Sequence, residues 1–284
     1  MSQTLSSRLM DAVSIATIRS FCLELLQNGA LEVKLAAPAT ELEDPPAPAL
    51  CLMQPARSSG LAMASGAAPL PRPGALSSPA ARATVLARLA HHELQAAELF
   101  AWALLRWPEA PASLRRGWLG VLVDEQRHCR MYLERLAAQG DDFAAHAPHS
   151  DYFWKHVPTL DTAPEGPASF LCVLGLTLEQ ANLDFAAVYR DGFREAGDEA
   201  TALVLERVQA DEVGHVALAA RWLRDLLPDE ADEVARYERA VPFPFTAARA
   251  KGRRFDAQAR RRAGLSESFI AHVRGARSSQ ERAR

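Results

Sequence analysis

Two copies of the sequence Asp-Glu-x-x-His constrain the fold more than any other feature of this chain. The first spans residues 124–128 and the second spans residues 211–215. Residues three apart lie on one face of an α-helix, so the glutamate and histidine of each copy point the same way. The surrounding residues are apolar at helical spacing, which predicts that these side chains face a core. An unpaired carboxylate there costs roughly several kcal/mol, so both copies need partners.

Each copy follows a glutamate that lies on the apolar face of an earlier helical segment. Glu93 precedes Glu125 by 32 residues, and Glu179 precedes Glu212 by 33. The chain thus repeats one module, a helix with glutamate followed by a helix with Glu-x-x-His. Two such modules packed antiparallel bring four carboxylates and two imidazoles to one level of a four-helix bundle. This is the arrangement that holds two metal ions in ferritin-like carboxylate proteins.

Mixed carboxylate and imidazole ligands favour iron or manganese over metals that prefer thiolates. We expect two iron ions, with two manganese ions or a mixed manganese–iron pair as alternatives. The predicted ligands are four glutamates and two histidines: Glu93, Glu125, His128, Glu179, Glu212 and His215. By position, Glu125 and Glu212 are predicted to bridge the two ions and to be central to catalysis. The other two glutamates are predicted to be terminal ligands, and each histidine is predicted to bind one ion.

Four further residues are predicted to support this site. Asp124 and Asp211 each precede a ligand and can reach the histidine of the opposite helix to orient its ring. His91 is a candidate for a similar supporting role. Tyr132 lies one turn beyond His128 and is either an electron or hydrogen-bond donor or a core tyrosine.

Two alternatives stay open at this stage. One is a metal-free bundle in which the same side chains form buried salt bridges, an expensive arrangement. The other is that Glu98 replaces Glu93, although its 27-residue spacing to Glu125 breaks the repeat.

The predicted fold is all-α, a ferritin-like four-helix bundle with extensions at both ends. Its four helices are expected at residues 79–106, 112–139, 167–196 and 198–227, where prolines and glycines mark the ends. We predict three parts: an N-terminal helix with a proline-rich segment (1–77), the bundle (78–228) and a basic C-terminal helical extension (229–284).

The flanking segments are less regular. A helical pattern covers residues 14–35, and nine of the eighteen prolines follow between residues 37 and 80. Regular structure cannot persist there, so this segment is expected either to wrap on the bundle or to be partly disordered. Histidines of the linker at 140–166 are expected at the surface. Pro242 and Pro244 are expected to form a rigid turn, with Phe243 and Phe245 as apolar anchors.

The four scattered cysteines argue against a disulfide framework and favour a reducing compartment. No secretory signal and no apolar run of about twenty residues are evident, so we expect a cytoplasmic protein that does not span a membrane.

The stretches LARLAHHELQAAELF, VDEQRHCRMYLERLAAQGDDF, ERVQADEVGHVALAARWLRDL and PFPFTAARAKG resemble an uncharacterised bacterial ferritin-like family with a domain of unknown function. More distantly, the paired motifs are similar to those of tRNA-modifying di-iron hydroxylases, bacterioferritin and the small subunit of ribonucleotide reductase. The resemblance implies the ferritin-like fold and a di-metal site, and it implies no particular substrate.

Three function classes compete. The first is a di-iron oxidoreductase, an oxygenase or hydroxylase that uses dioxygen as cosubstrate. Its electrons would come from a separate reductase or from the substrate itself. The second is a ferroxidase or iron-storage subunit, and the third is a non-catalytic binding module stabilised by metal. The long additions to the bundle favour the first class, because such additions commonly build a substrate pocket. We expect a monomer or dimer.

The substrate is expected to be a small or anionic molecule. The basic residues Arg249, Lys251, Arg253 and Arg254 follow the proline turn and are predicted to lie near the mouth of the metal site. They would attract a phosphate, a carboxylate or an RNA backbone there, or else form a solvated tail.

Overall fold

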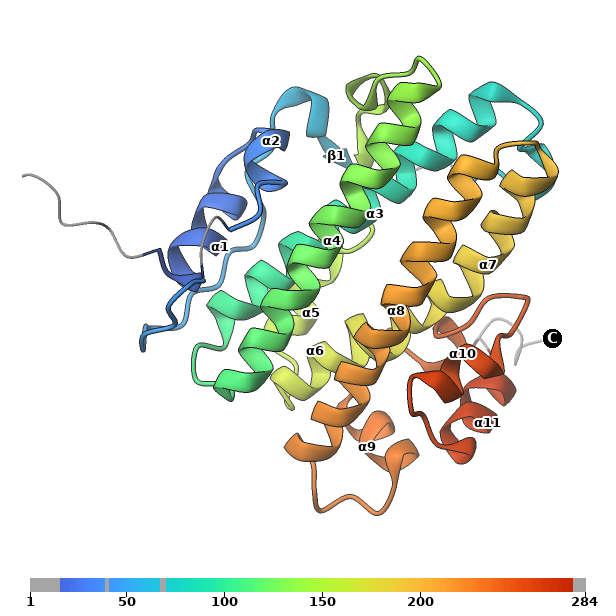
Figure 1. Ribbon diagram of the computed structural model, residues 1–284. Helices are drawn as coiled ribbons and strands as arrows, with labels where there is room; N and C mark the ends of the chain where they lie inside the picture. Colours follow the sequence, from blue (N-terminus) through green and yellow to red (C-terminus); the bar gives the residue numbers. More distant parts are fainter. Residues whose placement is uncertain (1–15, 39–40, 67–69, 278–284) are drawn as a thin grey trace, which may run out of the picture.

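The computed structural model describes residues 16–38, 41–66 and 70–277, and in this part of the chain the predicted all-α class is confirmed. Four long helical segments lie side by side and form what we call the helix core (Figure 1). They are α3 (Pro79–Arg106), α4 (Ala112–Ala138), the run of α6 (Pro167–Val173), η5 (Leu174–Glu179) and α7 (Gln180–Glu195), and α8 (Glu199–Leu226). The bounds predicted from the sequence agree with these to within about two residues, the usual uncertainty of helix ends.

Local sequence explains where these helices begin and end. Pro79 occupies the first position of α3, where its missing N–H is not needed. Gly140 and Gly197 follow α4 and α7 in the left-handed region, with φ of +77° and +79°. Asp198 then caps α8 by accepting a hydrogen bond from the backbone N–H of Thr201 at 3.0 Å.

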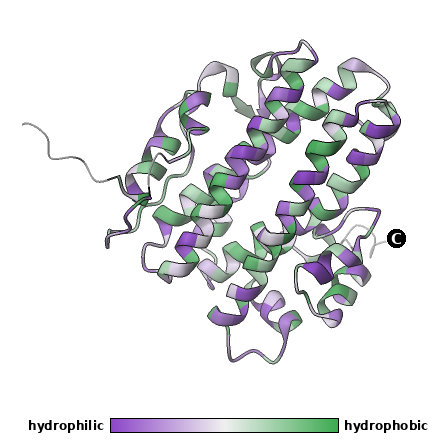
Figure 2. Cartoon of the chain, in the orientation of Figure 1, coloured by the Kyte–Doolittle hydropathy of each residue, from purple (hydrophilic) through white to green (hydrophobic). Residues whose placement is uncertain are grey.

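The helix core packs as two helical pairs. Helix α3 packs along α4, α7 packs along α8, and α4 and α6 both contact α8. Figure 2 shows hydrophobic and hydrophilic residues alternating along these helices, as expected where one face of each helix is buried. The buried apolar residues form two clusters, one toward each end of the core. The change from one cluster to the other falls just after Glu93 on α3, between Leu94 and Ala96. On α4 it falls at Glu125 to His128, and on α8 at Glu212.

The N-terminal segment lies against α3. The helix predicted over residues 14–35 is wrong as a single element, because α1 (Ile18–Gln27) and α2 (Leu31–Lys34) are separate. The side chain of Asn28 accepts a hydrogen bond from the backbone N–H of Ala30 at 2.9 Å, which favours a turn between them. Residues 14 and 15 lie outside the described residues.

The proline-rich segment wraps on the helix core where it is described. Leu50 N–H donates to the carbonyl of Leu105 at 2.9 Å, and Ala56 N–H donates to that of Leu26 at 2.7 Å. Its regular elements are short: η1 (Ser59–Leu61), β1 (Met63–Ala64) and η2 (Pro73–Ala75). Strand β1 pairs in parallel with β2 (His149–Ser150), which ties this segment to the linker after α4. That linker also contains η3 (Phe143–His146), η4 (Trp154–His156) and α5 (Val157–Asp161).

The C-terminal extension folds back on the helix core. It comprises α9 (Glu233–Ala240), η6 (Ala247–Arg249), α10 (Ala257–Arg262) and α11 (Glu267–Gly275). Arg260 of α10 and Asp184 of α7 are both fully buried and form an ion pair at 2.8 Å. Of the two predicted anchors, Phe245 is buried, whereas Phe243 is 88% exposed. The prediction for Phe243 is therefore wrong: the turn that buries one ring leaves the other in solvent.

Among the described residues, one helix, Pro167–Glu195, has the length and apolar composition of a membrane span. However, 78% of its most apolar 18-residue stretch is buried inside the protein, against the rest of the helix core. A buried core helix meets the same criteria, so this helix is only weak evidence for a membrane.

Candidate metal centre

The six predicted ligands converge at the level where the two apolar clusters meet. They form two overlapping groups: Glu93, Glu125, His128 and Glu212 in one, and Glu125, Glu179, Glu212 and His215 in the other. Within each group the ligand atoms all lie within 4.8 Å of one another. Glu125 and Glu212 belong to both groups, which is the position predicted for bridging carboxylates.

The two histidines are held in matching orientations. The Nε2 atom of His128 lies 3.2 Å from Asp211, and that of His215 lies 3.2 Å from Asp124. This is the contact with the opposite helix predicted from the sequence. The Nδ1 atoms point the other way. That of His128 lies 3.5 Å from a carboxylate oxygen of Glu125, and that of His215 lies 3.1 Å from the other. Each aspartate therefore fixes its ring with Nδ1 directed at the shared carboxylates.

Two supporting residues were not predicted from the sequence. Arg127 lies between the two aspartates and forms ion pairs at 2.8 Å with both Asp124 and Asp211. Asn182, one turn after Glu179, donates a hydrogen bond to Glu212 at 2.9 Å. An asparagine on a helix and an arginine inside the motif look like ordinary surface residues until the helices are packed.

The burial of this cluster fits divalent metal ions. All six side chains are buried, and both oxygens of Glu125 and the Nδ1 atoms of both histidines make no hydrogen bond of good geometry, although they lie within ion-pair distance of one another. Such buried unpaired groups are costly. Four ionised carboxylates together balance the charge of two divalent cations. The orphaned atoms favour a metal centre over the alternative of a metal-free core held by salt bridges.

The electrostatics of the protein without metal point the same way. Burial and the neighbouring Glu125 and Glu212 raise the pKa of Glu93 well above its usual value. Burial also raises the pKa of Glu179. Although burial opposes it, the surrounding carboxylates raise the pKa of His215 well above its usual value. Four ionised carboxylates this close repel one another, and cations bound among them would offset that repulsion.

A π-helical turn positions Glu179. The segment η5 interrupts the third long helix and ends at this glutamate. Such turns are rare, and they occur frequently at functional sites. Gly175, within this turn, lies so close to α8 that an added Cβ would be 2.3 Å from the Cβ of Ala219. Glycine is therefore required where the third helix approaches α8 beside the ligands.

A cavity of about 270 Å³ reaches the metal centre from one side. Four of the six ligands line it, namely Glu93, Glu125, Glu179 and Glu212. Most of the other lining residues are apolar, including Leu89, Leu174, Leu178, Leu205 and Val208. Tyr132 also lines this cavity, and burial together with the nearby glutamates raises its pKa well above the usual value.

Glu98 does not belong to the metal centre. It is fully buried and pairs with Lys34 at 2.9 Å and with Arg57, and it accepts a hydrogen bond from Trp154 at 2.8 Å. These contacts join the N-terminal segment and the linker to α3. The competing assignment considered for Glu98 is therefore wrong, and Glu93 takes the place that its spacing predicted.

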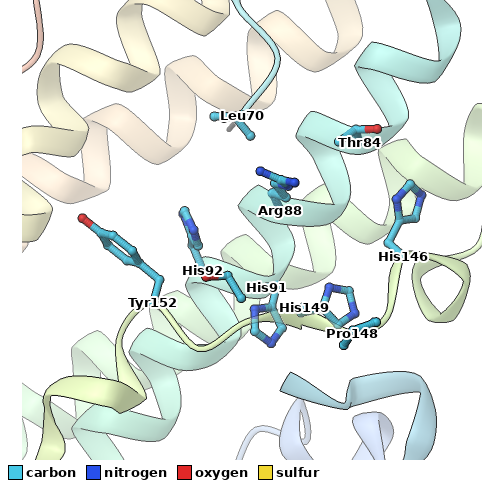
Figure 3. A pocket seen from close by; sticks show the side chains of 10 residues that line it. Leu70, Thr84, Arg88, His91, His92, His146, Pro148, His149 and Tyr152 are labelled. Atoms are coloured by element: carbon cyan, nitrogen blue, oxygen red, sulfur yellow. The ribbon is translucent and has the colours of Figure 1, made fainter. Parts of the chain in front are cut away.

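The contacts of His91 also lie away from the six ligands. It hydrogen-bonds to Gln95 at 3.0 Å and stacks on His149 at 4.4 Å between ring centroids. Figure 3 shows it beside a second hollow of about 270 Å³, with other histidines around it. The supporting role predicted for His91 stays a prediction, and these contacts give no support to it.

The linker histidines are not surface residues as predicted. His149 and His156 are buried, and His146 is half-buried. Burial lowers the pKa of both His149 and His156 to about 4, so both are neutral near pH 7. The linker packs these rings on other aromatic side chains, which the local sequence does not reveal. Among the described residues, they are in neither of the two candidate metal-binding groups.

Comparison with known proteins gives a family and no function. No curated protein and no solved structure matches the chain. A family model does match, over residues 16–271, and this stretch contains all six candidate ligands. Because the match covers most of its length, the chain belongs to the family described as Protein of unknown function (DUF455).

Proposed function

We propose that this protein is a di-iron carboxylate oxidoreductase that uses dioxygen to oxidise an organic substrate, with manganese or a mixed manganese–iron pair as alternatives. The observation that carries the proposal is the pair of glutamates shared by two buried ligand groups at the end of an apolar cavity. We place the chain with ferritin-like proteins on this ligand set and its two-module repeat.

The ligand set suits two ions in equivalent surroundings. Glu93 and His128 would hold one ion, and Glu179 and His215 the other. Glu125 and Glu212 would lie between them. A pair of ferrous ions held there supplies the reductive activation of dioxygen, which gives an oxidant for C–H bonds.

The chain's own residues would do the rest. Asp124 and Asp211 hold the histidine rings so that Nδ1 faces the ions. We call the cavity beside the ligands the substrate cavity. Its apolar walls would exclude water and orient the substrate beside Glu93 and Glu179. Tyr132 stands in the same cavity, where its hydroxyl can donate a hydrogen bond or a hydrogen atom.

Hydroxylation of a C–H bond by dioxygen forms an alcohol and water, and it consumes two electrons and two protons. We propose that a separate reductase supplies the electrons, because no nucleotide-binding glycine loop is evident in the sequence. The cavity beside the ligands favours this oxygenase function over iron storage, which needs no organic substrate pocket.

Oxygen consumption tests the proposal. Protein loaded anaerobically with two equivalents of ferrous iron is expected to take up dioxygen rapidly. The oxidised iron should stay bound, and after reduction with dithionite the protein should take up dioxygen again. No uptake would favour a structural metal site, whereas a large cage that mineralises many ions per chain would favour storage. Size-exclusion chromatography, in which we expect a monomer or dimer, separates these cases.

A further inference from the structure

A broad groove adjoins the substrate cavity on the side of the C-terminal extension. It encloses about 900 Å³, and Phe185 and Tyr189 of α7 line both the groove and the cavity. Phe185 is 47% exposed although it is a large apolar residue, so it offers a free aromatic surface where the two spaces meet. The groove and the cavity therefore adjoin at these two rings, on the side of the cavity whose lining includes the glutamates.

The groove is strongly basic. Its cations come from segments far apart in the sequence: Arg72, Lys251, Arg253, Arg274 and Arg277. The acidic residue of its lining, Asp184, is already neutralised by the buried Arg260, and it also accepts hydrogen bonds from the backbone N–H groups of Gly252 and Asp256. Within the described residues, neither Arg72 nor Arg253 forms an ion pair. Arg72 and Arg253 thus add positive charge to the groove that no described carboxylate offsets through an ion pair.

The substrate cavity has one cation of its own. Arg249 is half-buried and lines the cavity, where its guanidinium donates a hydrogen bond to the hydroxyl of Tyr152 at 3.2 Å. It lies 4.4 Å from the centroid of the Phe245 ring and forms no ion pair with a described carboxylate. A partly desolvated arginine beside an apolar space is a ready partner for an anionic oxygen.

We infer that the substrate is an amphipathic phosphate ester whose phosphate lies in the basic groove and whose apolar part enters the substrate cavity. Several guanidinium groups around one groove suit the oxygens of a phosphate better than the single charge of a carboxylate. The largely apolar cavity wall, built of aliphatic and aromatic side chains, suits an alkyl or prenyl-like group. A single-stranded nucleic acid would call for a row of stacking aromatic side chains along the groove. The aromatic residues of the groove lining are Phe185 and Tyr189, which are too few for such a row.

This inference rests on the proposed function only in taking the cavity as the substrate's route to the metal centre. The basic residues were expected near this site, and the structure divides them. Arg249 lines the cavity, Lys251 and Arg253 line the groove, and Arg254 instead pairs with Asp191. Arg253 and Arg254 are adjacent and both exposed, so they form a matched pair for a test.

Calorimetric titration with octyl phosphate, methyl phosphate and octan-1-ol tests the inference in the absence of dioxygen. Octyl phosphate is expected to bind at least about tenfold more tightly than either fragment, because it alone occupies both spaces. Arg253→Gln should weaken this binding by roughly fivefold, as for loss of one charge-assisted contact, while Arg254→Gln should change it by less than about twofold. Both variants lose one charge, so a general charge effect would weaken both equally.

Three results would overturn the inference. The first is that octyl phosphate binds no more tightly than octan-1-ol. The second is that the two arginine variants weaken the binding of octyl phosphate equally. The third is that a short RNA binds in a way that depends on Arg253 while octyl phosphate does not bind. The proposed function fails separately: binding with no oxygen uptake would refute the oxidoreductase alone. Oxygen uptake by a protein that does not bind octyl phosphate would refute only the inference that the substrate is a phosphate ester.

Discussion

Replacing Glu125 by alanine is expected to remove both metal ions rather than one. Glu125 belongs to both ligand groups and both of its buried oxygens lack hydrogen-bond partners in the protein, so each ion would lose a ligand. Loss of a negative charge also leaves two divalent ions close together with less compensation. Metal analysis of the purified variant should find almost no bound iron, while circular dichroism shows the helices retained.

Two other glutamate variants serve as controls. Glu134→Ala lies on the same helix at an exposed position and should leave the metal content unchanged. Glu179→Ala removes a residue of one group only and should weaken one ion preferentially. If Glu125→Ala kept one ion as firmly as the wild type, Glu125 would not be a bridge.

The variants Glu93→Gln and Glu98→Gln are expected to have opposite effects, although the residues are five apart on one helix. Glu98→Gln leaves the buried charges of Lys34 and Arg57 without their carboxylate. Breaking a buried ion pair in this way typically costs about 3–5 kcal/mol of unfolding free energy. Metal content should stay normal, since Glu98 lies outside both ligand groups.

Glu93→Gln should instead weaken metal binding and leave the metal-free protein at least as stable. Its carboxylate has a raised pKa because it is buried beside Glu125 and Glu212, so a neutral amide relieves repulsion there. Urea denaturation of both variants in the metal-free form, together with metal analysis, measures the two effects. Equal loss of metal in both variants would contradict the separation of the two glutamates.

The helix core could be predicted from the sequence because its signals are local. Pro79, Gly140 and Gly197 mark helix ends through backbone geometry alone, and apolar periodicity identifies the buried faces. The ligand set followed from the same periodicity, since Glu93, Glu125 and their counterparts interrupt apolar faces at repeated spacings. The division of the chain into three parts stays a prediction, as does the ferritin-like assignment.

The remaining features depend on tertiary packing that no local pattern encodes. Arg127 reaches both aspartates only because α4 and α8 lie together, and Lys34 meets Glu98 from 64 residues away. The π-helical turn before Gln180 arises within an apolar run that reads as ordinary helix. The burial of the linker histidines and the exposure of Phe243 were likewise decided by which segments cover them.

Anomalous diffraction from crystals of the iron-loaded protein, recorded at the iron absorption edge, tests the central claim most directly. We expect two peaks of similar height between Glu125 and Glu212, separated by about 3.5–4 Å as in other two-metal sites. One peak should lie next to His128 and the other next to His215. A single peak, or peaks away from these six side chains, would contradict a di-metal centre.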